Sequence, residues 1–280
     1  MAVSFVALPA AASLFGAEAA LVGAAVGLLV GLTSMGAGAL LTPALVLLLG
    51  VPPRIAVGSD VLIAGVMKLF GGGAYAVRRA VHWPTVLRLL VGSVPGALAG
   101  LWLLRMVPDG SLDAIIARLL GIAMLASGAV SLVRYLRRMP DEAVSSPSPA
   151  GVAAIGFATG LLVSVTTVGS GSILIFVLAR FFPLRARQLV GTDLAHAFVL
   201  SLVAAAGHGF AGRLDPALAL AVLAGAVPGV IAGALLAGKV PERALRTALA
   251  TIVFTVGVRF TALPAATRND APVALREVSR

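Results

Sequence analysis

Long apolar runs separated by short polar segments make up most of this chain. No charged residue stands between Glu18 and Arg54, and similar apolar runs recur as far as residue 262. A run of roughly 20 apolar residues matches the hydrocarbon core of a bilayer, which is about 30 Å thick. The pattern predicts a long segment over 17–50 that is interrupted at 33–38, followed by simple spans over 54–78, 84–106 and 111–136.

A segment rich in charge, serine and proline then separates this first half from a second one. The second half begins with a long segment over 151–182, interrupted at 166–172, and continues with spans over 187–211, 216–238 and 242–262. The predicted organisation is a lead-in at 1–16, a first transmembrane repeat at 17–136, a cytoplasmic linker at 137–150, a second repeat at 151–262 and a polar tail at 263–280.

The two halves match without a gap when one is shifted by 133 residues. RIAVGSD at 54–60 falls on RQLVGTD at 187–193, and VPGALAG at 94–100 falls on VPGVIAG at 227–233. Matching arginine, aspartate and Pro-Gly positions indicate an internal duplication. The loops rich in Lys and Arg all fall on one side of the membrane only if each interrupted segment turns back to the side it entered. The predicted fold is therefore all-α, a polytopic transmembrane helical bundle of two inverted repeats, each with a broken, re-entrant hairpin plus three spans.

Composition supports a membrane protein and narrows its chemistry. Of the 280 residues, 60% are hydrophobic and 11% are charged, against about 25% charged in a typical soluble domain. The net charge of +10 sits mostly in short loops, as the positive-inside rule expects, so we predict no nucleic-acid partner. The chain has no cysteine, its three histidines are scattered, and no Walker A loop is present. We therefore expect no metal and no cofactor.

The two interruptions combine glycines with hydroxyl residues, which unwind a helix and expose its backbone. Non-helical backbone survives at membrane depth only where protein or water satisfies it, and half-helix N-termini there offer N–H donors to an anion. Thr33 and Ser34 stand in capping positions of a half-helix that would start near 36–38. We predict an anion site formed by the two tips, through Thr33, Ser34, Gly36, Gly38, Thr166, Thr167, Gly169, Ser170, Gly171 and Ser172.

Close helix packing is the alternative explanation for glycines in such a chain. We favour it for the glycines that lie away from the two tips, among them Gly23, Gly27, Gly92, Gly100, Gly225 and Gly233.

Ionisable residues inside the spans are costly in a bilayer and functional by default. Lys68 follows Asp60 by eight residues, about 12 Å of helix rise, so the two should not pair directly. We predict that Lys68 contributes charge to the substrate site. Asp60, its repeat equivalent Asp193, His196 and His208 are candidates for proton coupling, with helix capping open for the aspartates and a structural hydrogen bond open for the histidines.

The stretches at 31–83 and 169–210 resemble the sulfite exporter TauE/SafE family of bacterial membrane permeases, and the resemblance covers roughly 20–260. The correspondence includes the Gly-rich break, Gly-Val-Pro at 50–52, Ala-Val-Gly-Ser at 56–59 and His-Trp at 82–83. Ser59 replaces the usual threonine, and Ala37 stands where many members carry glycine. The resemblance implies a multi-pass protein of the bacterial inner membrane that transports sulfur-containing anions such as sulfite, sulfonates, sulfoacetate or thiosulfate.

We therefore expect a secondary transporter (permease) of small anions that works by alternating access, driven by proton or anion gradients. Its partners would be a small anionic substrate and the lipid bilayer, while homo-oligomerisation stays open. The alternatives are an anion channel and an intramembrane hydrolase using Ser170 with His196 or His208. Against a hydrolase, the first repeat has Ile63 where the second has His196, whereas transport predicts a duplicated site. We therefore expect no enzyme activity.

Overall fold

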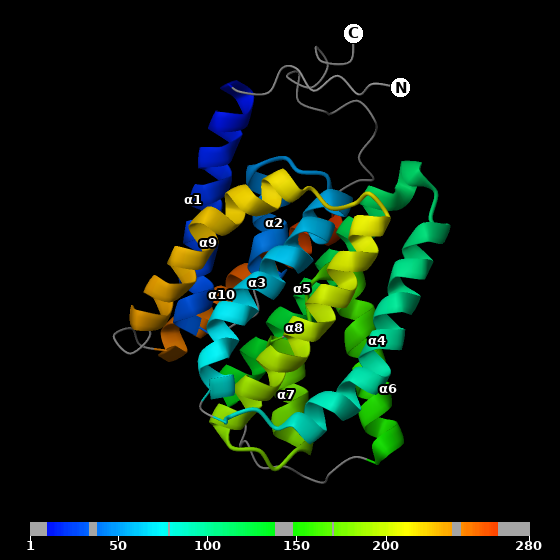
Figure 1. Ribbon diagram of the computed structural model, residues 1–280, viewed down its shortest axis with the longest axis vertical. Helices are drawn as coiled ribbons and strands as arrows, with labels where there is room; N and C mark the ends of the chain where they lie inside the picture. The colour runs from blue at the N-terminus through cyan, green and yellow to red at the C-terminus, as the bar shows by residue number, and fades with distance from the viewer. Residues whose placement is uncertain are drawn as a thin grey trace.

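The computed structural model describes residues 10–33, 38–77, 79–137, 148–169, 171–236 and 242–262. Within these ranges the chain forms ten helices and no strand (Figure 1). The helices are α1 (Ala10–Thr33), α2 (Gly38–Leu48), α3 (Pro53–Val77), α4 (Trp83–Met106), α5 (Asp109–Arg137), α6 (Pro149–Thr166), α7 (Ser172–Phe181), α8 (Ala186–Phe210), α9 (Pro216–Leu236) and α10 (Glu242–Ala262).

The helices follow the predicted spans closely, and both predicted interruptions are real breaks. The all-helical fold is confirmed. Two boundaries differ, because α1 already begins at Ala10, inside the expected lead-in, and α5 continues to Arg137, the first residue of the expected linker. The start and end of α3 map onto those of α8 at the same shift of 133 residues, so the periodicity of the sequence carries into the structure.

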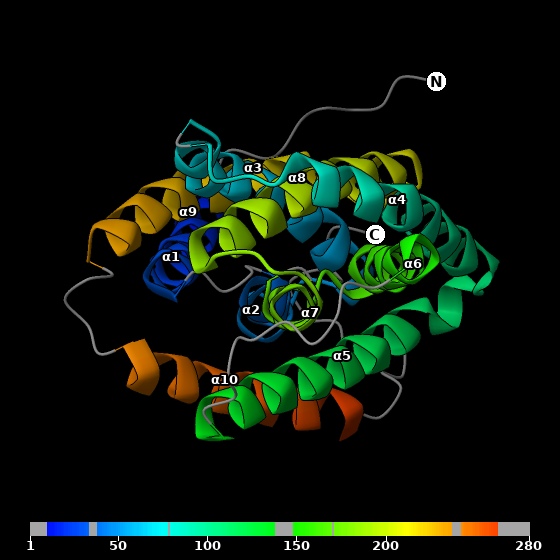
Figure 2. The ribbon, with the colours of Figure 1, turned by 90° about the horizontal axis from the view of Figure 1, so that it is seen from below.

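The short helices α2 and α7 lie one above the other in the middle of the bundle (Figures 1 and 2). The long helices surround them in pairs: α1 packs on α9, α4 on α6, α3 on α8 and α5 on α10. Under the shift of 133 residues, α1 corresponds to α6 and α4 corresponds to α9, so the α1–α9 pair corresponds to the α6–α4 pair. The α3–α8 and α5–α10 pairs each join a helix to its own repeat equivalent.

Glycines form the seams of the α1–α9 and α4–α6 pairs. A Cβ atom at Gly23, Gly27, Gly225 or Gly233 would lie 2.4 Å or less from a backbone oxygen of the opposite helix. Gly92 and Gly100 are equally tight, with contacts at 1.9 and 2.2 Å against α6. The prediction that these glycines serve packing is confirmed, and both seams join helices that run in the same direction.

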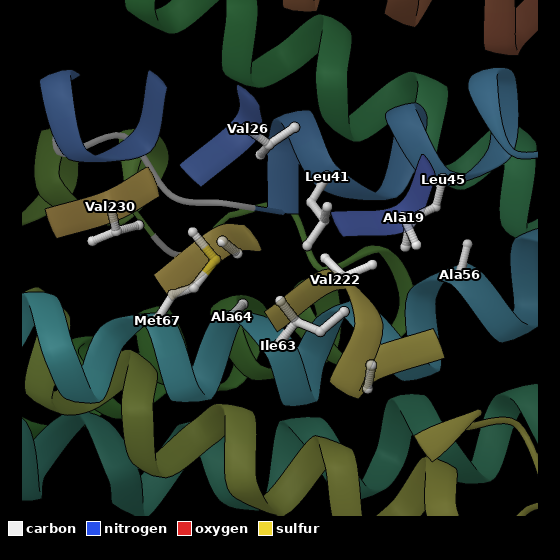
Figure 3. Packing of buried hydrophobic residues seen from close by; sticks show 12 residues of the cluster. Ala19, Val26, Leu41, Leu45, Ala56, Ile63, Ala64, Met67, Val222 and Val230 are labelled. Carbon is white, nitrogen blue, oxygen red and sulfur yellow. The ribbon is translucent and has the colours of Figure 1, made fainter. Parts of the chain in front are cut away.

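Two apolar clusters flank the centre and are related by the repeat. The first joins α1, α2, α3 and α9, and in Figure 3 Leu45 lies beside Ala19 while Leu41 lies closer to Val26, so α2 runs back along α1. The second cluster joins α4, α6, α7 and α8. Ala19, Leu41, Leu45, Ala56 and Val222 of the first correspond at the common shift to Val152, Leu174, Leu178, Leu189 and Leu89 of the second.

The outer surface is apolar, as contact with lipid requires. Leu21, Val91 and Leu235 are 71%, 70% and 77% exposed, and a soluble protein avoids so many exposed large apolar side chains. Six helices within the described ranges are long and apolar enough to cross a membrane, namely α1, α4, α5, α6, α8 and α9. This set differs from the six simple spans expected from the sequence, because it includes the first arms of both broken segments and leaves out α3 and α10.

Candidate functional site

The two helix breaks meet each other inside the bundle. A Cβ atom at Gly38, the first residue of α2, would lie 2.3 Å from the carbonyl oxygen of Thr167, the C-cap residue that follows α6. Only glycine allows this approach, so the start of one half-helix rests directly on the end of another. The sequence predicts both breaks, and the structure brings them together.

The connection from α6 to α7 is built from unusual backbone conformations. Thr167, Gly169 and Gly171 have φ angles of 60°, 121° and 108°. Glycine adopts such angles readily, whereas a β-branched residue at positive φ carries strain of roughly 1–3 kcal/mol. The backbone N–H of Thr167 donates to Val163 O at 2.8 Å, which holds the residue in this conformation. Strain of this kind concentrates at functional sites.

Asp60 lies at the junction of the breaks and is fully buried. Its Oδ2 accepts hydrogen bonds from the hydroxyls of Thr42, in α2, and Thr167, the latter at 2.9 Å. The two hydroxyl oxygens are 2.8 Å apart, and Thr167 Oγ1 also lies 3.3 Å from Gly38 O. The other carboxylate oxygen, Oδ1, has no hydrogen-bond partner among the described residues. Asp60 therefore does not cap its own helix, and four oxygen-bearing groups converge here.

Asp193 occupies the equivalent position in the second repeat and contacts the other half-helix. Its Oδ1 accepts a hydrogen bond from the backbone N–H of Gly171, the residue that precedes α7, at 3.3 Å. A carboxylate at a helix N-terminus is favoured by the helix dipole. Asp193 is thus bonded to the N–H of Gly171, which is one of the helix-end donors predicted to bind an anion.

Lys68 lies where the two repeats meet. Its Nζ donates a hydrogen bond to Ser201 Oγ at 3.1 Å. Ser201 is the residue that corresponds to Lys68 when the sequence is shifted by 133 residues. The bond therefore joins positions that correspond in the two halves of the sequence. Lys68 is within electrostatic range of both Asp193 and Asp60. In the described residues the one ion pair within contact distance is Arg54–Asp113, so Lys68 touches neither aspartate, as predicted for Asp60.

The two buried histidines make different contacts. His196 Nε2 lies 2.8 Å from the hydroxyl of Ser93, in α4. His208 Nε2 lies 2.8 Å from the carbonyl oxygen of Ser164, so this nitrogen carries a proton and donates it. Neither Nδ1 atom has a partner among the described residues. His208 therefore has a structural bond, while His196 is three residues from Asp193 and close enough to interact with Lys68.

The structure separates the predicted site residues into groups. Gly38, Thr167 and Asp60 come together at one tip, and Gly171 and Asp193 at the other, with Lys68 bonded to Ser201. Thr33 and Thr166 are the last residues of α1 and α6, and their hydroxyls donate to the carbonyls of Leu29 and Leu162 in their own helices. The predicted capping by Thr33 concerns residues 34–37, which lie outside the described residues, and stays a prediction. Ser34, Gly36, Ser170 and the side chain of Ser172 lie outside the described residues.

Three residues at the site escaped the sequence analysis: Thr42, Ser93 and Ser201. Applying the repeat shift to Lys68 would have identified Ser201. Thr42 is a lone hydroxyl between apolar residues and the helix-internal Pro43, which is a weak signal. Nothing in the sequence points to Ser93, because its contact with His196 joins residues 103 positions apart. Within the described ranges no three His, Asp or Glu residues gather into a metal site.

An apolar bundle with paired broken helices at its centre, buried charges beside the breaks and a lipid-facing surface defines a multi-pass membrane transporter. The chain belongs to the sulfite exporter TauE/SafE family, whose model matches residues 19–260. It is accordingly a membrane transporter of the cell membrane, as the resemblance implied.

Two relatives are both described as probable membrane transporters of Bacillus subtilis (strain 168). The chain is 34% identical to the probable membrane transporter protein YjnA over 247 residues, which cover 85% of this chain and 97% of that protein. It is 23% identical to the probable membrane transporter protein YunE over 257 residues, covering 85% of this chain and 93% of that protein. No solved structure matches the chain.

Proposed function

We propose that this protein is a secondary transporter of small anions, and of sulfur oxyanions or organosulfonates such as sulfite or sulfoacetate in particular. The observation that carries the proposal is the buried Lys68, bonded to Ser201 and next to the two helix breaks. A buried ammonium group in a membrane protein marks a substrate or ion pathway. The family description, sulfite exporter, agrees with an anionic sulfur substrate.

The anion would bind between the N-terminal ends of α2 and α7, with Lys68 supplying charge and the backbone N–H groups supplying donors. One of these donors, Gly171 N, is bonded to Asp193. An arriving anion must displace that carboxylate, and like charges oppose the exchange. Protonation of Asp193, with His196 as a proton relay, would remove the repulsion. Anion transport would thereby be coupled to a proton gradient.

Alternating access would arise from two inverted repeats that rock about this site. In support, the repeat-equivalent helices α3 and α8 run antiparallel, since Gly58 packs against His208 and Gly65 against Ser201. Two further bonds are equivalent under the repeat shift: His82 N donates to Thr192 Oγ1 and Asp215 N donates to Ser59 Oγ, each at 3.0 Å.

The two alternative functions, an intramembrane hydrolase and an anion channel, predict different experimental results. We infer that the chain is not a hydrolase, because its family and relatives are described as transporters and the first repeat has Ile63 in place of His196. Labelling of the purified protein by a serine-directed probe would instead support a hydrolase. An anion channel would give single-channel currents in planar bilayers, which alternating access does not.

The test is uptake of labelled sulfite and of labelled sulfoacetate by proteoliposomes. Removing a charged hydrogen-bonding group costs about 1.5–3 kcal/mol, so Lys68→Met should transport at no more than about a tenth of the wild-type rate. Lys68→Arg should retain more, because it keeps the charge. Arg88→Gln removes an exposed charge from α4 and serves as the control. Wild-type rates in Lys68→Met would overturn the site assignment.

A further inference from the structure

The charges buried at the centre do not balance. Asp60, Asp193 and Lys68 are all buried, and Lys68 is the single buried lysine or arginine side chain among the described residues. Lys68 is within electrostatic range of both aspartates but forms an ion pair at contact distance with neither, so one ammonium group faces two carboxylates. Because an unpaired charge is costly at membrane depth, Asp60 must take up either a proton or a metal cation.

The surroundings of Asp60 consist of oxygen atoms rather than cationic side chains. Thr42 Oγ1 and Thr167 Oγ1 contact Oδ2 of the carboxylate, and Gly38 O lies 3.3 Å from Thr167 Oγ1. Asp60 Oδ1 is buried and has no donor among the described residues. Pro43 lacks the N–H that the carbonyl of Ala39 would accept in a regular helix, so another carbonyl oxygen in the first turn of α2 loses its helical partner.

The hydrogen atoms present are too few for these oxygens. The two hydroxyls and Asp60 Oδ2 form a triangle, with hydrogen-bonding contacts along all three edges. When Asp60 is ionised, two hydroxyl protons can fill two edges, so the third edge joins oxygens with no proton between them. The Thr167 hydroxyl is also claimed by Gly38 O at 3.3 Å. A bound cation would turn these competing lone pairs into ligands.

We propose that Asp60, Thr42, Thr167 and the carbonyl of Gly38 bind a sodium ion. Carboxylate, hydroxyl and carbonyl oxygens suit a hard cation, and a single carboxylate matches a single positive charge. Carbonyls of unwound backbone and the C-terminal ends of half-helices coordinate Na⁺ in transporters with broken helices, and Thr167 is the C-cap residue of α6. These oxygens are in hydrogen-bonding contact and must separate to coordinate an ion, and the smaller Na⁺ requires less separation than K⁺. Asp60 thus carries a sodium ion instead of the proton expected from the sequence.

The second repeat does not reproduce this group of ligands. The residue equivalent to Thr42 is Ile175, which has no oxygen to offer. Asp193, the equivalent of Asp60, instead accepts a backbone N–H from Gly171. The structure therefore assigns a cation to the first repeat alone and leaves the α7 end for the anion.

This inference rests on the proposed function for its purpose, since the sodium ion would be a second coupling ion beside the proton at Asp193, but its test needs no substrate. Radioactive sodium binding is measured on the purified full-length protein in detergent, with K⁺ and choline as competitors. Thermal unfolding of the same protein is followed in NaCl and in choline chloride, because a ligand that binds the native state raises its stability. Sodium binding without anion uptake would refute the proposed function and leave this inference standing.

The variants are chosen to keep the fold. Thr42→Val preserves the shape of a fully buried side chain and removes one ligand, so sodium affinity should fall by about tenfold or more. Thr42→Ser restores the hydroxyl and should restore binding. Thr159→Val is the matched control, because the Thr159 hydroxyl donates only to Ile155 O in its own helix. Absence of saturable sodium binding in the wild type, displacement by K⁺ as effective as by Na⁺, or unchanged binding in a folded Thr42→Val protein would each overturn the proposal.

Discussion

The glycine seam between α1 and α9 offers a sharp test of the packing. In Gly225→Ala, the new methyl carbon would lie 1.8 Å from Ala20 O and 2.7 Å from Ala20 C. A relaxed contact between carbon and carbonyl oxygen is about 3.3 Å, so the helices must separate locally by about 1.5 Å. Both atoms that clash belong to the backbone, and no side-chain rotation relieves them.

The loss of folding stability comes from separating α1 and α9 along their glycine contact. Overpacking of a well-packed interior costs about 1–3 kcal/mol, and Gly225 lies in a seam whose other glycines are equally tight. At about 2–4 °C per kcal/mol for a chain of comparable size, the melting temperature should fall by several degrees. Gly92→Ala, at the equivalent position of the α4–α6 seam, would place its methyl carbon 1.9 Å from Ala153 O and should behave alike.

The assay is thermal unfolding of purified protein in detergent, followed by size-exclusion chromatography of heated samples. Gly209→Ala is the matched control, because a Cβ atom there meets nothing within 4 Å. Alanine is favoured over glycine within a helix by about 1 kcal/mol, so the control should melt at or above the wild-type temperature. Equal losses in Gly225→Ala and Gly209→Ala would refute the steric argument, as would a Gly225→Ala protein that melts like the wild type.

Two further predictions concern the polar contacts. His208→Leu leaves the buried Ser164 carbonyl without its donor and should lower stability by about 1–3 kcal/mol, whereas His208→Gln retains an N–H group and should lose less; similar melting of the two variants would contradict this role. Arg54→Gln breaks the pair with Asp113, whose side chains are 36% and 32% exposed, and should cost no more than about 1 kcal/mol. A loss that is larger, or one that persists in high salt, would show that the pair is not the surface contact described here.

The sequence predicted the helices and their interruptions because both depend on local pattern. Apolar runs of membrane length, prolines at helix starts and glycines with hydroxyls at the breaks place the ends of α2, α3, α7 and α8 within a few residues. The repeat shift also anticipated that Asp60 and Asp193 would hold equivalent positions about two turns inside their helices. These features need no knowledge of which helices touch.

Only the tertiary structure decided which side chains share a site. The contact of Thr42 with Thr167 joins residues 125 positions apart, and that of Lys68 with Ser201 joins residues 133 apart. Hydrophobic periodicity states which face of a helix avoids lipid, but not which neighbour that face meets. The oxygen cluster around Asp60 exists because two helix breaks, distant in the chain, come to the same depth in the bundle.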